Sequence, residues 1–460
     1  MDETTATPTW RELVAAGDLG HPLPWSAAAE ARVDASWEAL RRLIAGGTAR
    51  VYGLHTGFGA DVDAPATHDA AAHQLGLLDS LCVGAGPPLP LRVVRRALRL
   101  QAFKVGQGFS GTHPQTVQRL RSLADQTELP RVPSWGSLGA SGDLIPMAHA
   151  VAPLFVDAAG SRQVPGPRDV LSLVNTNAMM ASWGVELTAQ VDELTWRQHL
   201  VTAAATLALG FDDEPFRRDT LDLPGQDPFV LEAGEQLSKA MHATADRLAG
   251  HLAPVPHRPL QARYSIRCAP QVLGGARWSL DTARERLTVE ALRVADNPII
   301  RERPDGPRAL HGGHFYALGI AHAADLLGDA LFRVVELADR QVLLLMDPTT
   351  SGGLPRNLEA PGRANVKGLH QLVSSLGQRL RALSMPSRLS SFSSESNNQD
   401  VVPCGLTALL SVQDQLDVAS EALRAAELIV ERALVLRAGR PVPPQLGPEG
   451  WLQGDPRRGS

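Results

Sequence analysis

An apolar stripe that repeats every three or four residues runs through residues 405–438 and strongly constrains how this chain can fold. Its members are Leu409, Val412, Leu416, Ala419, Leu423, Ala426, Val430 and Ala433. This spacing predicts a long helix with one continuous buried face. Similar stretches occupy residues from about 184 to 210 and from about 316 to 346, with few Gly or Pro inside. Because such helices need partners, the sequence predicts a mainly α fold with a long central helical bundle.

Three regions are expected along the 460 residues, whose 44% hydrophobic content is enough for a large core. Residues 1–184 form an N-terminal region of short helices and Gly-rich loops, and residues 185–400 form the central bundle. Residues 401–460 form a C-terminal helix and a tail. The last part of that tail, 444–460, has little apolar content and is expected to be loosely ordered.

Charge and cysteine content narrow the class of protein. The net charge of -5 argues against a nucleic-acid partner. The three cysteines are widely spaced, so a disulfide framework is not expected and a reducing compartment is favoured. The chain starts Met-Asp-Glu without a basic and apolar leader, and no run of about 18 apolar residues occurs. These features predict a cytoplasmic protein without membrane contact.

The tripeptide Ala140-Ser141-Gly142 lies between Gly139 and Asp143, where a chain can turn sharply. Attack of the Gly142 nitrogen on the Ala140 carbonyl, with loss of two waters, would give a 4-methylideneimidazol-5-one (MIO) ring. Glycine permits the close approach, and serine supplies the hydroxyl that leaves. The product is a carbon electrophile, which ordinary side chains lack. An ordinary turn is the simpler alternative. A hydrolase nucleophile is disfavoured, because Asp143 stands where that motif needs glycine.

Residues 136–146, Gly-Ser-Leu-Gly-Ala-Ser-Gly-Asp-Leu-Ile-Pro, resemble the motif of the aromatic amino acid ammonia-lyase and aminomutase family. Five further segments resemble other motifs of that family. In chain order they are 51–59, 261–271, 296–298, 312–315 and 395–401. They follow the family's order from about residue 50 to 410, so the resemblance covers most of the chain. It implies an MIO-dependent ammonia-lyase that converts an aromatic L-amino acid to an arylacrylate.

Such an elimination needs a base for the β-proton and an electrophile that turns the amine into a leaving group. The resemblance implies that Tyr52 is the base. Its phenol, of ordinary pKa about 10, would need that pKa lowered by positive charge or hydrogen bonds. Arg267 would hold the substrate carboxylate through its planar guanidinium. The remaining catalytic residues implied are Ala140, Ser141, Gly142 and Tyr264. The remaining substrate-binding residues implied are Gly59, Ser80, Leu81, Asn175, Gln261, Phe315, Glu395, Asn398 and Gln399.

Some positions depart from the family's pattern. They are His55, Thr176, Ala262 and His314. The selectivity pair Ser80-Leu81 matches none of the pairs typical of histidine, tyrosine or phenylalanine lyases. Leu81 offers no hydrogen bond to an imidazole or phenol, and neutral Gln399 replaces a glutamate of histidine lyases. A phenylalanine-like or larger apolar aromatic substrate is therefore expected over histidine.

The resemblance also implies a homotetramer whose active sites are shared between chains. No metal is expected, because His311, His314 and His322 lie on or near a Gly-rich loop without carboxylate or thiolate partners. Two alternatives remain open. One is an aromatic amino acid 2,3-aminomutase, which re-adds ammonia at Cβ, and the other is a non-catalytic scaffold descended from this family.

Overall fold

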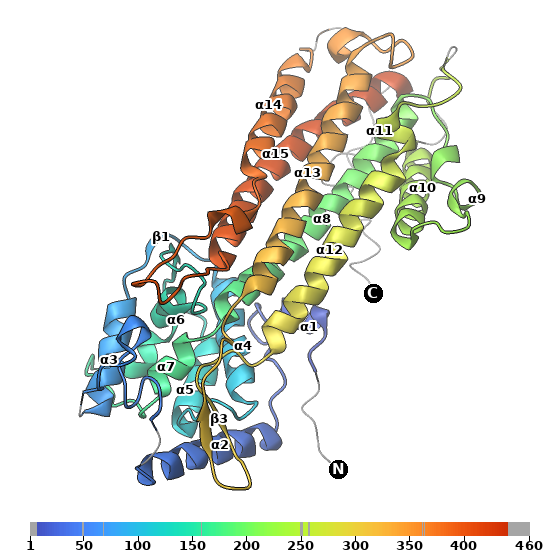
Figure 1. The fold of residues 1–460 in the computed structure, drawn as a ribbon. Helices are drawn as coiled ribbons and strands as arrows, with labels where there is room; N and C mark the ends of the chain where they lie inside the picture. Colours follow the sequence, from blue (N-terminus) through green and yellow to red (C-terminus); the bar gives the residue numbers. More distant parts are fainter. Residues whose placement is uncertain are drawn as a thin grey trace. The chain divides into compact units, whose positions relative to one another are not determined.

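The structure is a computed structural model, and the chain is mainly helical, as predicted (Figure 1). The structure describes residues 7–47, 50–67, 69–157, 159–248, 252–255, 258–360, 362 and 364–439. The expected loosely ordered tail, 444–460, lies outside these described residues. No helix in the described part of the chain is long and apolar enough to cross a membrane.

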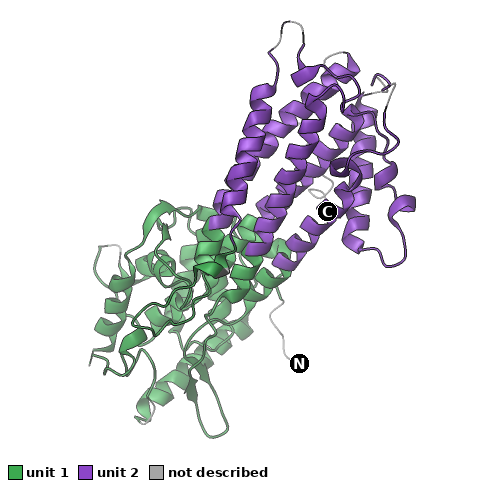
Figure 2. Ribbon diagram, turned by 45° about the horizontal axis from the view of Figure 1, so that its top comes forward, with its two compact units in different colours: residues 1–187, 284–324, 386–410 green, residues 188–283, 325–385, 411–460 purple. Residues whose placement is uncertain are grey.

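The chain forms two compact units, each assembled from segments that are distant in sequence (Figure 2). Unit 1 comprises residues 1–187, 284–324 and 386–410, and unit 2 comprises residues 188–283, 325–385 and 411–460. Four long helices have residues in both units: α8 (Ala178–Ala208), α12 (Ala269–Leu292), α13 (Leu318–Met346) and α15 (Gly405–Ala438). The contiguous division at residues 184 and 400 stays a prediction.

Unit 1 contains short helices, two small sheets and long loops. Its helices are α1 (Trp10–Ala15), α2 (Ala27–Ala45), η1 (Gly59–Asp61), α3 (Ala70–Leu81), α4 (Leu91–Val105), α5 (Pro114–Ala124), α6 (Leu144–Val151), η2 (Ala152–Phe155), α7 (Asp169–Val174) and η5 (Ser387–Ser390). Strands β1 (Ala85–Pro88) and β2 (Pro133–Trp135) pair antiparallel, as do β3 (Ile299–Arg301) and β4 (Arg308–Leu310). The first of these sheets leads directly into the segment that carries the tripeptide.

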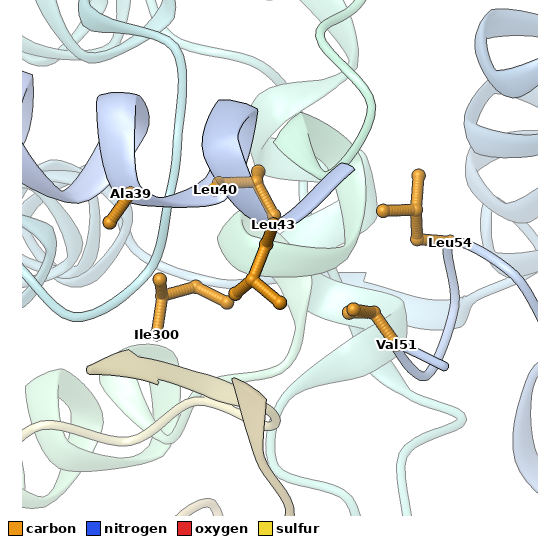
Figure 3. Close-up of a cluster of buried hydrophobic side chains, with 6 residues drawn as sticks. All are labelled: Ala39, Leu40, Leu43, Val51, Leu54 and Ile300. Atoms are coloured by element: carbon orange, nitrogen blue, oxygen red, sulfur yellow. The ribbon is translucent and has the colours of Figure 1, made fainter. Parts of the chain in front are cut away.

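A buried apolar cluster holds the loop that carries Tyr52 (Figure 3). Its residues are Ala39, Leu40 and Leu43 of α2, Val51 and Leu54 of the loop, and Ile300 of β3. Val51 and Leu54 flank Tyr52 in sequence, so their burial fixes the backbone on both sides of the phenol. Burying a side chain of this size contributes about 1.5–3 kcal/mol. The loop is therefore anchored by packing although it contains several glycines.

A buried arginine connects α4 to the start of α8. The Arg96 side chain is fully buried and donates to the carbonyls of Leu13 (2.8 Å), Val14 (2.8 Å) and Ser182 (3.0 Å). Its guanidinium also pairs with the Glu186 carboxylate at 2.9 Å. A buried charge is stable only when its donors are matched in this way. These bonds fix the first turns of α8, whose backbone amides hydrogen-bond to Asp143, the residue that follows the tripeptide.

Unit 2 is a bundle built on the four long helices. Its further helices are η3 (Glu214–Phe216), α9 (Arg218–Leu221), α10 (Pro228–Leu248), α11 (Tyr264–Arg267), η4 (Arg356–Leu358) and α14 (Lys367–Leu383). All eight members of the stripe predicted over 405–438 are buried along α15, which confirms that helix. The stretches predicted near 184–210 and 316–346 are also confirmed as helices, in α8 and α13.

Candidate active site

The Ala140-Ser141-Gly142 tripeptide forms a tight turn between β2 and α6. Gly139 and Gly142 face each other in an antiparallel bridge, with φ of 70° and 76°. These angles lie in the left-handed region, which glycine adopts at little cost. A Cβ at position 142 would overlap the carbonyl oxygen of Thr176. The turn therefore requires glycine at this position, for both backbone angle and space.

Asp143 fixes the downstream end of the turn to α8. Its amide donates to the Thr176 carbonyl at 2.5 Å. Its carboxyl Oδ2 accepts from the amides of Met179 (2.7 Å) and Met180 (3.1 Å) in the first turn of α8. Burial raises the pKa of this carboxyl to about 7, although the two backbone donors oppose the shift. The turn is thus attached to a helix that is itself held by Arg96.

Two polar side chains contact Ser141. Asn175 Nδ2 donates to the Ser141 carbonyl at 3.0 Å, and Gln399 Nε2 donates to the Ser141 hydroxyl at 3.2 Å. The other amide atom of Asn175, Oδ1, is buried without a hydrogen-bond partner among the described residues. A buried acceptor without a partner costs free energy. The Asn175 Oδ1 atom is therefore suited to accept a hydrogen bond from a bound ligand.

A pocket of about 890 Å³ in unit 1 opens onto Ser141. It gathers most of the residues that the sequence predicted for the site. Those lining it are Tyr52, Gly59, Ser80, Leu81, Ala140, Ser141, Asn175, Phe315, Glu395, Asn398 and Gln399. Gly142 is buried next to the pocket, beneath the Thr176 carbonyl. The structure therefore places the phenol and the tripeptide at one cavity.

The Tyr52 phenol lines this pocket, and its pKa is shifted in the direction opposite to the expectation. Its hydroxyl oxygen accepts a hydrogen bond from the Gly59 amide at 2.7 Å. Burial raises the pKa of Tyr52, the Gly59 amide opposes the shift, and the Glu395 carboxylate raises the pKa further. The expected lowering of this pKa is wrong for the isolated chain, because burial and a nearby negative charge outweigh one backbone donor.

Glu395 connects the Tyr52 loop to the tripeptide. Its Oε1 accepts from the Ala60 amide at 3.3 Å, and its Oε2 accepts from Asn398 Nδ2 and Gln399 Nε2, each at 2.9 Å. Residues 395–397 all have φ between 53° and 64°. A run of non-glycine residues in the left-handed region is strained, which is a frequent property of functional sites. A side chain at Gly59 would overlap the Glu395 carboxylate, so glycine permits this contact.

One face of α3 forms a wall of the pocket, and only two of its four lining residues were predicted from the sequence. His73 and Leu77 line the pocket together with Ser80 and Leu81. Their spacing of four, three and one residues is that of a single helix face, which was a usable signal. The Ser80 hydroxyl donates to the Leu77 carbonyl at 2.8 Å, and His73 Nε2 lies 3.1 Å from the Thr56 carbonyl. Their hydrogen-bonding capacity is thus directed in part to backbone groups.

His311 also lines the pocket, although the sequence did not predict it as a site residue. Its Nε2 accepts from the Tyr52 amide at 3.3 Å, and burial lowers the pKa of the imidazole, with Arg168 lowering it further. No sequence pattern signals this contact, because it joins residues 259 positions apart. Across the described residues, no group of three or more His, Cys, Asp or Glu side chains could hold a metal ion.

The other predicted site residues, Gln261, Tyr264 and Arg267, belong to unit 2 and form a cluster of their own. Arg267 Nη1 donates to Gln261 Oε1 at 2.6 Å, and the guanidinium lies 4.7 Å from the centre of the Tyr264 ring. Gln341 Nε2 of α13 donates to the Ser265 carbonyl at 2.7 Å and so supports α11. Tyr264 is 70% exposed. The three residues are not among those that line the unit 1 pocket.

Comparison with known proteins decides the family. The sequence model described as "Aromatic amino acid lyase" matches residues 9–448. The chain belongs to the aromatic amino acid lyase family. The resemblance drawn from the motifs is therefore confirmed, and so is an enzyme of the carbon–nitrogen lyase class.

Named members of the aromatic amino acid lyase family show how far the likeness extends. A histidine ammonia-lyase of Anaeromyxobacter dehalogenans is 31% identical over 415 residues, covering 84% of this chain and 80% of the relative. A tyrosine ammonia-lyase of Cereibacter sphaeroides is 32% identical over 433 residues, covering 85% and 80%. The solved phenylalanine aminomutase of Pantoea agglomerans has the same fold, with a TM-score of 0.85, 24% identity and coverage of 98% and 93%.

Proposed function

We propose that this chain is an MIO-dependent ammonia-lyase that acts on an aromatic L-amino acid with an apolar ring. One observation carries the proposal. Hydrogen bonds join Tyr52 to Gly59, the next residue Ala60 to Glu395, and Glu395 through Gln399 to Ser141. A base and an electrophile must act on adjacent atoms of one substrate, so their attachment to a single pocket is the arrangement that this elimination requires.

The residues around the tripeptide fit an MIO ring. Gly142 has the backbone angle and the lack of a side chain that ring closure needs. Asn175 donates a hydrogen bond to the Ser141 carbonyl, and its buried Oδ1 has no partner within the part of the chain that the structure describes. The ring would supply a carbon electrophile that accepts the substrate's amine and makes it a better leaving group. Glu395 lies at the same pocket, where its carboxylate would bind and orient that amine.

Tyr52 is proposed as the base that takes the β-proton. Because a neutral phenol is a poor base, a nearby positive charge is needed to lower the raised pKa of Tyr52. Arg267 carries the positive charge that would both bind the substrate carboxylate and favour the phenolate. We propose that Gln261, Tyr264 and Arg267 reach this pocket from other copies of the chain in a homotetramer. The exposure of the Tyr264 ring supports this role, since an exposed aromatic beside an arginine suits an interface.

The α3 wall supports a substrate with an apolar ring. Leu77 and Leu81 present hydrocarbon to the pocket, and the Ser80 hydroxyl donates to the Leu77 carbonyl. An imidazole would therefore be desolvated with few partners on this wall, at a cost of about 1–3 kcal/mol. We expect kcat/KM for phenylalanine to exceed that for histidine by about 5- to 150-fold. Steady-state assays with histidine, tyrosine, phenylalanine and tryptophan, following arylacrylate absorbance and β-amino acid formation, test this expectation.

A pair of variants tests whether the α3 wall sets the choice. Leu81→His should gain activity on histidine, whereas Leu75→His, the same change on α3 outside the pocket, should not. A preference of the unmodified enzyme for histidine would contradict the proposed substrate. Accumulation of a β-amino acid in place of the arylacrylate would instead identify an aminomutase.

The raised pKa of Tyr52 gives a pH dependence with a definite sign. Because the base is the phenolate, kcat/KM should rise as pH increases toward the Tyr52 pKa. Glu395→Gln removes a negative charge that raises this pKa, so the rise should move to lower pH, whatever happens to the maximal rate. Glu302→Gln, an exposed glutamate paired with Arg42 away from the pocket, should leave the profile unchanged. A profile for Glu395→Gln that stays in place or moves to higher pH contradicts the assignment.

A further inference from the structure

Ser137 lies outside the tripeptide but hydrogen-bonds both to the residue that precedes it and to its last residue. Its hydroxyl oxygen accepts a hydrogen bond from the Gly139 amide at 3.1 Å. The same hydroxyl donates to the Gly142 carbonyl at 3.2 Å. One side chain thus bridges the residue before Ala140 and the last residue of the tripeptide, alongside the antiparallel bridge between Gly139 and Gly142.

The two flanks are otherwise held differently. The downstream flank is fixed to α8 through the Asp143 amide and carboxyl. The upstream flank, Gly136 to Gly139, contains two glycines with positive φ, and its Leu138 side chain is 45% exposed. Glycines leave the backbone free to move, so a link between the flanks is needed to hold the Ala140 carbonyl near the Gly142 nitrogen.

We propose that Ser137 is a positioning residue for the self-cyclisation of Ala140-Ser141-Gly142. This inference rests on the proposed function. The reaction forms a bond between the Gly142 nitrogen and the Ala140 carbonyl carbon. The Ala140 carbonyl oxygen leaves as water with the amide protons of Gly142 and Ser141. The Ser141 hydroxyl leaves as a second water with the Ser141 Cα proton. No oxidant or reductant is required. Through its two hydrogen bonds, Ser137 would hold the reacting atoms close together.

The test measures ring formation directly. The protein is made by cell-free synthesis, and samples are stopped with denaturant at timed intervals. Each sample is then digested with trypsin, which releases residues 132–162 as one peptide. The fraction of this peptide that has lost two waters gives the rate of cyclisation without any activity assay. For Ser137→Ala we expect a rate lower by about tenfold, from the loss of two hydrogen bonds that hold the turn.

Matched variants separate positioning from general damage. Ser134→Ala makes the same change on the same peptide, and the Ser134 hydroxyl is buried without a hydrogen-bond partner among the described residues. It should cyclise at the unmodified rate. Ser137→Thr keeps the hydroxyl and should cyclise faster than its isostere Ser137→Val. This pair also decides the question if Ser137→Ala does not fold, as judged by circular dichroism.

Equal rates for Ser137→Ala and the unmodified chain would overturn the proposal, as would equal rates for the Thr and Val variants. A rate for Ser134→Ala as low as that for Ser137→Ala would also overturn it. The effect would then come from loss of any serine hydroxyl in this segment, and not from the Ser137 hydrogen bonds. A full-mass peptide from the unmodified chain is a different result, since it would contradict the proposed function itself.

Discussion

Replacing Tyr52 by phenylalanine is expected to lower kcat by about 10²- to 10⁴-fold, the usual contribution of a general base. The change removes one oxygen atom, which accepts from the Gly59 amide and faces the pocket. The aromatic ring remains, and its edge contact with Phe58, at 6.3 Å between ring centres, should keep the loop in place. Substrate should still bind, because none of the groups proposed to hold its amine or carboxylate is altered.

The matched control for this variant is Tyr316→Phe, the same change at another tyrosine of the same pocket. It should cost far less than Tyr52→Phe. Stopped-flow or steady-state rates give kcat, and the mass of peptide 132–162 shows whether the tripeptide is cyclised in each variant. Near-normal turnover by a fully cyclised Tyr52→Phe enzyme would remove the phenol from its role as the base.

Replacing Ser141 by alanine is expected to have the largest effect on turnover. The variant lacks the hydroxyl that leaves during formation of the exocyclic carbon, so no electrophile forms and the amine remains a poor leaving group. We expect kcat to fall by more than about 10⁴-fold, beyond the range expected for loss of the base alone. Ser141 is half-buried at the pocket, and among the described residues its hydroxyl is bonded only to Gln399, so the fold should tolerate the change.

Ser134→Ala is the control for this second variant, because it removes a hydroxyl from the adjacent strand β2 and from the same tryptic peptide. It should keep full activity. Thermal unfolding of both variants shows whether any loss of activity reflects loss of structure. Turnover by Ser141→Ala within about tenfold of the unmodified enzyme would mean that the chemistry does not depend on this residue.

The helices were predictable because periodicity is a local property. Every member of the α15 stripe is buried, as its spacing indicated. The grouping of segments was not predictable in the same way. Unit 1 combines residues 284–324 and 386–410 with the N-terminal region, and no local pattern states which distant segments pack together. The four long helices also have residues in both units, so neither unit is a single stretch of the sequence.

At the site, the motifs predicted most of the residues that the structure brings to one pocket, but not the contacts that surround them. The pKa of Tyr52 moves opposite to the expected direction because the phenol is buried and, to a lesser extent, because the Glu395 carboxylate, far away in the sequence, lies near it. His311 was missed for a similar reason. His73 and Leu77 were missed despite a usable signal, since they share a face of α3 with Ser80 and Leu81. Ser80 and Leu81, predicted as a selectivity pair, belong to a longer pocket wall on α3.

The mass of tryptic peptide 132–162 from the unmodified enzyme tests the central claim most directly. The proposed function depends on an electrophile made from Ala140, Ser141 and Gly142, and the peptide contains all three residues. The account predicts a mass lower than the sequence requires by two waters, with fragmentation that places both losses within the tripeptide. A peptide of full sequence mass with an intact Ser141 side chain, from a folded and freshly purified protein, would contradict it.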